Sequence, residues 1–509
     1  MTESARQARQ SPHWPAAVRR AAAVCLAACA SCATGRSERA ALDTQTIAES
    51  SAAESAAADG FSTAAVPEGG ARPALTPELQ RLRRLAQQRV LGRDAERGLP
   101  TLTYDAGAAA QALYQPTFGQ FVPMVPESAL GHFHAALTRL AQGTDEDGKV
   151  RILAYGASHT QADAYTGYLR AYLQSRFGDG GQGFVMLGRV NNWYRTLDTA
   201  VRHKRASIHH ARLRADMQDE PLGLFGAALV GRYGDGFGEI ITAKNSPNTE
   251  FEVHYFTHPR GGDFTLRVDG KNIARIKTRS ANAGPAYYAF RTTPGRHAIR
   301  ARLHGRGVVR LFGITAETAR PGVVVDTLGI SGSRLASSLR WQEETWTSAL
   351  QRRSPDLVTF AYGTNELMDP GHSSAAYQRQ LRAVLTRLRK ALPEVSCAFI
   401  APFDVPKREG GSWVGRPRLV EIIETQRRIS QEFGCAFWDG YAFMGGGGAL
   451  HRWSRANPPL ASRDHVHLTR RGYVYAGTAI GDALMRAYDE GLAQSSGAPV
   501  AAAPSPASP

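Results

Sequence analysis

The chain has 509 residues, 43% of them hydrophobic, so it can bury a substantial core, and its length indicates about two or three folded units. Lys and Arg number 61 against 45 Asp and Glu, a net charge of +16 that favours anionic partners such as acidic glycans, cell-wall polymers, phospholipid headgroups or nucleic acid. The sequence has neither an aromatic-rich basic motif of the RNA-binding type nor zinc-finger spacing, which argues against nucleic acid.

The first residues have the pattern of an export signal. Arg19 and Arg20 precede an apolar run over 21–30 that is too short to cross a bilayer as a helix. We therefore predict a signal peptide over residues 1–30 and a protein of the periplasm or cell envelope. Within this run Leu26-Ala27-Ala28-Cys29 resembles a bacterial lipoprotein box, which favours a lipid anchor at Cys29 over ordinary cleavage at the same small residues.

Both ends of the remaining chain are of low complexity. Residues 31–100 are rich in Ala, Ser, Glu and Arg, which predicts a linker containing one helical stretch near 79–91. The segment 494–509 is nearly all Ala, Pro and Ser and is predicted to be a disordered tail.

Between these ends, strands and helices alternate. Short continuous apolar runs are typical of strands buried on both faces of a parallel sheet; they cover 150–155, 322–325, 357–362, 397–401 and 435–438. Apolar residues at helical spacing predict helices over 377–392, with Ser373 or Ser374 as its cap, over 419–429 and over 472–488. The pattern predicts an α/β fold.

One connection is far longer than the about 30 residues that a strand-helix-strand unit needs. The first two predicted strands are separated by everything from Ser158 to Pro321. Inside this stretch apolar residues alternate over 264–268, before an Asp269-Gly270 turn, and again over 299–303. We predict an inserted all-β sandwich over 196–321.

The cysteines do not form a disulfide scaffold. Three of the five lie in the leader, which leaves Cys397 and Cys435. An oxidising compartment permits one bridge between these two, but both lie in apolar strand-like runs, where a free buried cysteine is favoured. Metal-ligand spacing is absent.

Ser158 follows the strand predicted over 150–155 and precedes a helix predicted over 163–176. A serine at such a turn lies at the carboxyl end of the sheet, where α/β enzymes bind ligands, and the helix N-terminus favours developing negative charge. Taken alone, the serine is better explained as a helix cap, and the segments described below change that interpretation.

Asp464 and His467 lie just before the last predicted helix. This spacing lets the carboxylate accept the Nδ1 hydrogen of His467 while Nε2 faces a serine, so that His467 acts as the base for Ser158. A capping loop with a surface histidine explains the motif equally well when it is taken alone, and His465 is the lesser candidate for the base.

Two Gly-rich loops supply candidate oxyanion donors. Gly332 follows the second predicted strand and Asn365 follows the third. The backbone N–H groups of Ser158 and Gly332 and the side-chain amide of Asn365 can converge on a tetrahedral oxygen, where one donor contributes about 3 kcal/mol.

Together, Ser158, Gly332, Asn365 and Asp464 with His467 resemble the four sequence blocks of SGNH (GDSL-like) hydrolases, over most of residues 130–490. The sequence is most similar to the peptidoglycan O-acetylesterase branch of that family. The similar segments of this branch are 152–184, 311–313, 325–332 and 464–469.

The resemblance implies a flavodoxin-like three-layer α/β/α hydrolase domain formed by 101–195 and 322–493, with a carbohydrate-binding-like sandwich inserted after the nucleophile helix. It implies a serine esterase that removes O-acetyl groups from a cell-wall glycan, such as peptidoglycan, through an acetyl-enzyme on Ser158. Neither a metal nor an organic cofactor is expected.

The sequence departs from the family pattern at one position. The family usually has Gly-Asp-Ser, whereas Ala157 precedes Ser158 here. Loss of that carboxylate is expected to loosen the loop that aims Ser158 and one oxyanion donor, with reduced activity or a changed substrate. Asp163, nearby in the sequence, is a candidate substitute.

Two alternatives stay open. One is a glycan O-acetyltransferase or another SGNH esterase or lipase. The other is a catalytically weak glycan-binding lipoprotein, in which aromatic residues of the insert stack on sugars, although core packing is the favoured role of such residues in a sandwich. These aromatic residues are Tyr233, Phe237, Tyr255, Tyr287 and Tyr288.

Overall fold

The computed structural model describes residues 76–97, 99–100, 102, 119–210, 219–232, 234–369 and 371–495. All of them belong to one unit, Glu68–Pro509. The predicted leader with Cys29, the tail beyond residue 495 and Tyr233 lie outside the described residues.

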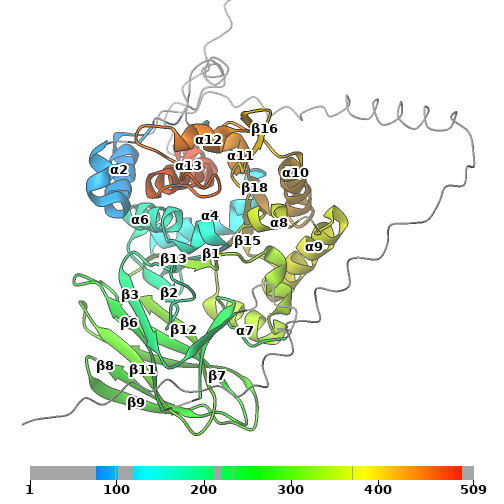
Figure 1. The fold of residues 1–509 in the computed structure, drawn as a ribbon. Coiled ribbons are helices and arrows are strands. Elements are labelled where there is room, and N and C mark those ends of the chain that lie inside the picture. The colour runs from blue at the N-terminus through cyan, green and yellow to red at the C-terminus, as the bar shows by residue number, and fades with distance from the viewer. Residues whose placement is uncertain are drawn as a thin grey trace, which may run out of the picture. The chain divides into compact units, whose positions relative to one another are not determined.

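A parallel sheet of five strands forms the centre of the α/β part (Figure 1). Its order is β13-β1-β14-β15-β18, and every neighbouring pair is parallel. The strands are β1 (Lys149–Gly156), β13 (Gly322–Gly329), β14 (Leu357–Ala361), β15 (Ser396–Ile400) and β18 (Ala436–Trp438). Nearly all their residues are buried, as continuous apolar runs predict, and the predicted α/β fold class is confirmed.

Successive residues of β1 point into two different helical layers. Ile152 packs in the core cluster that contains residues of α4, α6 and α13, whereas Leu153 packs in the cluster that contains residues of α7, α9 and α10. The sheet therefore lies between two layers of helices, in the predicted three-layer arrangement. The helices are α4 (Gly131–Gln142), α6 (Tyr165–Phe177), α7 (Glu343–Arg353), α9 (Ser374–Ala391), α10 (Pro417–Glu432) and α13 (Arg470–Ser495).

Shorter helices, turns and a hairpin connect the strands and the long helices. The helices are α5 (Ser158–Gln161), α8 (Thr364–Leu367), α11 (Gly440–Met444) and α12 (Ala449–Ser454), with 3₁₀ turns η4 (Glu127–Leu130) and η5 (Leu335–Arg340). A two-stranded hairpin consists of β16 (Lys407–Glu409) and β17 (Ser412–Val414). Ser373 caps α9 by accepting the N–H of Ala376, as one of the two predicted caps.

Helix α2 (Pro77–Leu91) lies within the segment predicted as a linker, yet it is part of the folded unit. Thr76 caps it, and its residues Val90 and Leu91 are buried in the core cluster that includes α6 and α13. Arg83 pairs with Asp482 of α13. The 3₁₀ turn η2 (Gly92–Arg97) follows this helix. Apolar burial and an ion pair therefore hold α2 against the hydrolase domain.

Two antiparallel sheets form the inserted β sandwich (Figure 1). One has the order β3-β6-β11-β8-β9, and the other has the order β10-β7-β12-β5-β4, with β2 also paired to β12. The strands are β2 (Gly181–Val185), β3 (Thr199–Lys204), β4 (Ser207–His210), β5 (Ala227–Gly231), β6 (Gly234–Thr242), β7 (Glu250–Thr257), β8 (Asp263–Val268), β9 (Lys271–Lys277), β10 (Gly284–Arg291), β11 (Ala298–His304) and β12 (Val309–Glu317).

The predicted insertion is confirmed, and its periodicity has the expected cause. Phe264 and Leu266 of β8 are buried in the core between the sheets. Asp269 and Gly270 have φ values of 50° and 81°, the left-handed pair that a tight hairpin turn requires. Strand β2 joins the sandwich although it precedes residue 196, where we expected the insert to begin.

A buried ion-pair network joins the sandwich to the parallel sheet. Arg353 of α7 contacts both Asp326 of β13, with Nη2 to Oδ1 at 2.9 Å, and Glu317 of β12. Arg151 of β1 also binds Glu317, at 3.1 Å. Burial raises the pKa of Glu317, but the two guanidinium groups outweigh it and hold that pKa at about 2. Glu317 is therefore ionised at neutral pH.

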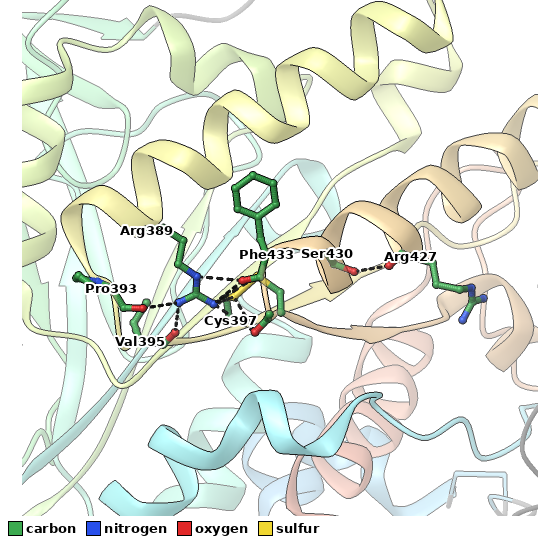
Figure 2. The surroundings of a disulfide bond; sticks show 9 residues. Arg389, Pro393, Val395, Cys397, Arg427, Ser430 and Phe433 are labelled. Atoms are coloured by element: carbon green, nitrogen blue, oxygen red, sulfur yellow. Dashed lines mark hydrogen bonds between the residues drawn. A yellow bond between two sulfur atoms is a disulfide. The ribbon is translucent and has the colours of Figure 1, made fainter.

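The prediction that the two cysteines are free and buried was wrong, because Cys397 and Cys435 form a disulfide (Figure 2). Cys397 lies on β15 and Cys435 directly precedes β18, and these strands are neighbours in the sheet, with Ala398 beside Ala436. The register therefore brings the cysteines together, with Cα atoms 4.7 Å apart. Arg389 of α9 donates to Cys397 Sγ and to surrounding backbone carbonyls, as Figure 2 shows.

Candidate active site

Ser158 lies at a tight turn between β1 and α5. A Cβ on Gly156 would lie only 2.0 Å from Oγ1 of Thr160, so this approach of strand and helix requires glycine. The carbonyl of Ala157 accepts the N–H groups of Thr160 and Gln161, at 3.2 and 3.0 Å. Ser158 is thus the first residue of a helical turn at the carboxyl end of the parallel sheet.

Ser158, His467 and Asp464 form a continuous hydrogen-bonded relay. Nε2 of His467 lies 2.9 Å from Oγ of Ser158, and Nδ1 of His467 lies 2.7 Å from Oδ2 of Asp464. These are the distances that a serine, its general base and the carboxylate that orients the base need. The structure therefore brings the three predicted residues together from the start of α5 and from the loop before α13.

The loop of Asp464 is held by the carboxylate itself. Oδ1 of Asp464 accepts the backbone N–H groups of Val466 and His467, at 3.0 and 2.9 Å. Burial raises the pKa of Asp464, but the hydrogen bonds from His467 and Val466 outweigh it and keep that pKa below its ordinary value. Asp464 is consequently ionised and can stabilise an imidazolium at His467.

His465, the competing candidate for the base, faces away from Ser158. Its Nε2 lies 2.9 Å from Nδ1 of His451 on α12. Trp413 of β17 stacks on His465 with ring centroids 3.9 Å apart, and it also stacks on His451 at 5.2 Å. His465 has φ of 56°, so this aromatic cluster contacts the strained residue between Asp464 and His467.

His159 packs against the ring of His467. It is buried beside Ser158, its Nδ1 lies 2.9 Å from the hydroxyl of Tyr473, and its ring centroid lies 5.4 Å from that of His467. Burial, reinforced by His467, lowers the pKa of His159 to about 3. A neutral ring therefore packs against the base over the whole physiological range.

The predicted oxyanion donors lie on loops bonded to the nucleophile turn. Ile330 N–H donates to the carbonyl of Gly156 at 3.0 Å, and Gly332 has φ of 77° within the turn that follows. Asn365 Nδ2 donates to the carbonyl of Ser333 at 2.8 Å, which uses one of its two hydrogens and leaves the other. The three loops that were predicted to supply donors are therefore adjacent.

Two side chains tie these loops together. Gln161, one turn after Ser158, accepts the N–H of Ser331 at 2.7 Å with Oε1. Buried Glu366 accepts the N–H of Gly363 at 3.0 Å and that of Leu335 at 2.9 Å. Burial raises the pKa of Glu366 above its ordinary value. These contacts fix the loop of Gly332 against both the nucleophile helix and the loop of Asn365.

Asp163 does not replace the carboxylate that Ala157 lacks. It is fully buried, and its oxygens accept hydrogen bonds from Arg170, Thr166, Thr327 and the backbone of Leu197. None of these residues belongs to the turn of Ser158. The suggestion that Asp163 supports this turn was therefore wrong, because an ion pair within the core already uses both oxygens.

The aromatic residues of the insert are mostly engaged within it. Tyr255 packs edge-on against Phe264, and Tyr288 packs against the sandwich core. Arg352 lies over the ring of Tyr287 at 5.1 Å, and Arg300 lies over that of Phe237 at 4.3 Å. Core packing and cation–π contacts therefore account for the four described aromatic residues of this set.

No group of three or more His, Cys, Asp and Glu side chains among the described residues has the arrangement of a metal site. No helix of this part of the chain combines the length and apolarity needed to cross a membrane.

Sequence reasoning missed Gln161, Glu366 and the cluster of Trp413 with His451. Gln161 and Glu366 carry a weak signal, because each lies within three residues of a predicted site residue. Trp413 and His451 carry none, since a loop hairpin and a separate helix bring them to the motif of His467.

Comparison with known proteins bears on the fold and on the class of enzyme. Residues 295–475 match the model of the GDSL-like Lipase/Acylhydrolase family. The solved structure of a peptidoglycan O-acetylesterase is similar at 25% identity, covering 70% of this chain and 96% of that chain, with a TM-score of 0.58. None of the curated proteins matches the chain.

More distant structures include family two carbohydrate esterases. One from Cellvibrio japonicus shares 11% identity and covers 57% of this chain and 99% of its own, with a TM-score of 0.24. One from Clostridium thermocellum shares 12% identity and covers 57% of this chain and 99% of its own, with a TM-score of 0.21. These two are too distant to carry an argument. The chain contains a GDSL-like acylhydrolase domain of the SGNH type and is a carboxylic ester hydrolase.

Proposed function

We propose that this carboxylic ester hydrolase is a serine O-acetylesterase, which removes acetyl groups from a cell-wall glycan, namely peptidoglycan. The observation that carries the proposal is the relay in which His467 Nε2 lies 2.9 Å from Ser158 Oγ and Asp464 binds the other ring nitrogen. The structural similarity to a peptidoglycan O-acetylesterase supports the choice of acetyl ester and glycan.

The first half of the reaction acylates the enzyme. His467 takes the proton of Ser158 as Oγ attacks the acetyl carbonyl carbon, and the carbonyl oxygen becomes a tetrahedral oxyanion. The N–H groups of Ser158 and Gly332 and the free hydrogen of Asn365 Nδ2 would stabilise this oxygen. His467 then protonates the sugar oxygen as the C–O bond breaks, which releases the sugar hydroxyl and leaves an acetyl ester on Ser158.

The second half regenerates the serine. His467 takes a proton from water as the water oxygen attacks the acetyl group, and the same donors stabilise the second oxyanion. Collapse of this intermediate returns the proton to Ser158 Oγ and releases acetate. Asp464 keeps His467 in the tautomer with hydrogen on Nδ1 and stabilises the imidazolium in both halves.

We place this activity outside the cytoplasm, with a lipid anchor at Cys29. The sequence pattern of the leader motivates both parts of this proposal. The disulfide between Cys397 and Cys435 supports an oxidising compartment, where such bonds persist. Mass spectrometry of the mature N-terminus of the protein from envelope fractions tests the anchor; an unmodified mature N-terminus would contradict it.

The function is tested by acetate release from O-acetylated peptidoglycan and from p-nitrophenyl acetate. The full chain is compared with Ser158→Ala, His467→Ala and, as a matched histidine control, His465→Ala. We expect both substrates to be hydrolysed, with losses of at least about 1,000-fold in the first two variants and a far smaller loss in the third. Absence of acetate release by the parent protein would refute the proposed activity.

A further inference from the structure

A groove with a volume of about 720 Å³ lies where the edges of the two sandwich sheets meet. Its walls come from β3, β4 and the loop before β3. Strand β3 is the outer strand of one sheet and β4 is the outer strand of the other. The groove therefore follows two exposed strand edges, where backbone and side chains are open to a ligand.

The groove is basic, and its described lining does not neutralise the charge. Arg189, Arg202 and Lys204 line it, and its lining includes no Asp or Glu. None of these three cations forms an ion pair within the described part of the chain, and Arg202 and Lys204 are exposed. Some other arginines of the sandwich are paired, for example Arg275 with Asp263 and Arg300 with Glu239.

The rim of the groove is bonded to the nucleophile helix. Asn191 lines the groove, and its side-chain amide exchanges two hydrogen bonds of 2.8 Å with that of Gln161. Gln161 lies one turn after Ser158 and also holds the N–H of Ser331. One pair of side-chain hydrogen bonds therefore links the rim of the groove to the residue that holds the loop of Gly332.

An exposed aromatic side chain flanks this rim. Trp193 donates its backbone N–H to Oδ1 of Asn191 at 2.9 Å, and its side chain is 75% exposed. An exposed indole offers a flat apolar face with a polar edge, which suits packing against a sugar ring. The rim thus adds an apolar contact to the charges of the groove.

We propose that this basic groove binds a carboxylate-bearing glycan and presents its acetylated sugar to Ser158. The inference rests on the proposed esterase function and specifies the substrate class, an acidic polymer. Carboxylates form charge-assisted hydrogen bonds with arginine and lysine, and the pairing is strongest where no competing carboxylate is present. The carboxylates can belong to uronic acids of the glycan or to peptides attached to it.

The test compares two charge-neutralised double variants of the full chain. Arg202→Gln with Lys204→Gln removes groove charge from β3. Lys271→Gln with Lys277→Gln is the matched control, because it removes equal charge from exposed residues of β9, the opposite edge of the same sheet. The substrates are O-acetylated muropeptides and O-acetylated oligogalacturonides, each with free or amidated carboxylates, and p-nitrophenyl acetate.

For the groove variant we expect kcat/KM on a free-carboxylate substrate to fall on the order of tenfold relative to that on p-nitrophenyl acetate. The fall should come from a higher KM. The control variant should keep the parent ratio, and amidated substrates should not respond to either change. The polymer class that shows the effect identifies the source of the carboxylate. An unchanged KM, or an equal loss on amidated substrates, would overturn the proposal.

Direct binding separates this inference from the esterase proposal. Binding of the Ser158→Ala protein to muropeptides and to polygalacturonate is measured by calorimetry at low and high salt. We expect salt-sensitive binding to at least one of them, weakened by the groove substitutions and not by the control. If no substrate releases acetate, the esterase proposal fails, but this measurement still tests whether the groove binds acidic glycans. If neither polymer binds, the proposed role of the groove is refuted.

Discussion

The indole of Trp413 lies flat on the imidazole of His465, with ring centroids 3.9 Å and planes 17° apart. His465 stands between Asp464 and His467 in the sequence and has φ of 56°. The hairpin of β16 and β17 therefore holds the loop that carries His467 and Asp464, and it does so through their neighbour His465.

Replacement of Trp413 by alanine should loosen this loop and misplace His467. Because small displacements of a base are costly, we expect kcat on p-nitrophenyl acetate to fall about tenfold or more with little change in KM. Trp413→Phe keeps an aromatic face on His465 and should restore most of the rate. Full kcat in the alanine variant would show that the stack does not position the loop.

Gln161→Ala should lower kcat by a different route. The variant deprives the N–H of Ser331 of its acceptor and leaves a half-buried donor unpaired, which costs on the order of 1 kcal/mol and frees the loop of Gly332. We expect about a tenfold loss in kcat through weaker oxyanion stabilisation. Gln351→Ala, on α7 away from the relay, is the control; equal losses in both variants would point to general destabilisation.

The network around Glu317 predicts a loss of stability in acid. Its pKa is about 2 in the folded protein against an ordinary value of 4.5, so the unfolded chain binds this proton more readily. The stabilisation, on the order of 3 kcal/mol, is complete above pH 4.5 and is lost as the pH falls from there towards 2.

Urea unfolding at pH 7 and at successive steps below pH 4.5 checks this prediction. Glu317→Gln should be less stable at pH 7 and should show a shallower acid dependence than the parent protein. Glu344→Gln is the matched control, because Glu344 is exposed and forms no ion pair within the described residues. Identical acid dependence of the parent and Glu317→Gln proteins would contradict the assigned role.

The disulfide predicts a separate stability effect. The bond closes a loop with a sequence separation of 38, for which restriction of the unfolded chain contributes about 3–4 kcal/mol. The double variant Cys397→Ser with Cys435→Ser should therefore unfold at a lower denaturant concentration. Dithiothreitol should lower the midpoint of the parent protein but not that of the variant; an equal response would mean that no bond forms.

Much of the hydrolase fold could be predicted, because strands buried on both faces leave continuous apolar runs in the sequence. The relay could be predicted for a related reason. Ser158 directly follows such a run, and parallel strands place their carboxyl ends at one edge, so loops that are far apart in sequence converge there. The insert was recognised because its period of two is that of a half-buried strand.

The remaining features depend on contacts that no local pattern records. Cys397 and Cys435 pair because β15 and β18 are neighbours, which follows from the strand order and not from the apolar runs themselves. Helix α2 was predicted, but it lies in a segment of biased composition, and its attachment through Arg83 to Asp482 had no sequence signal. The stack of Trp413 on His465 likewise needs the hairpin to fold over the loop.

Ser158 and His467, the proposed nucleophile and base, are separated by 309 positions, with the whole sandwich between them. A chain is synthesised from its N-terminus, so Ser158 emerges early, whereas Asp464 and His467 emerge only after β13, β14, β15 and β18. A nascent or truncated product that stops before Asp464 lacks the base proposed for Ser158. The proposed ester cleavage thereby requires synthesis at least through His467, and acylation by an active-site probe is expected to exclude shorter products.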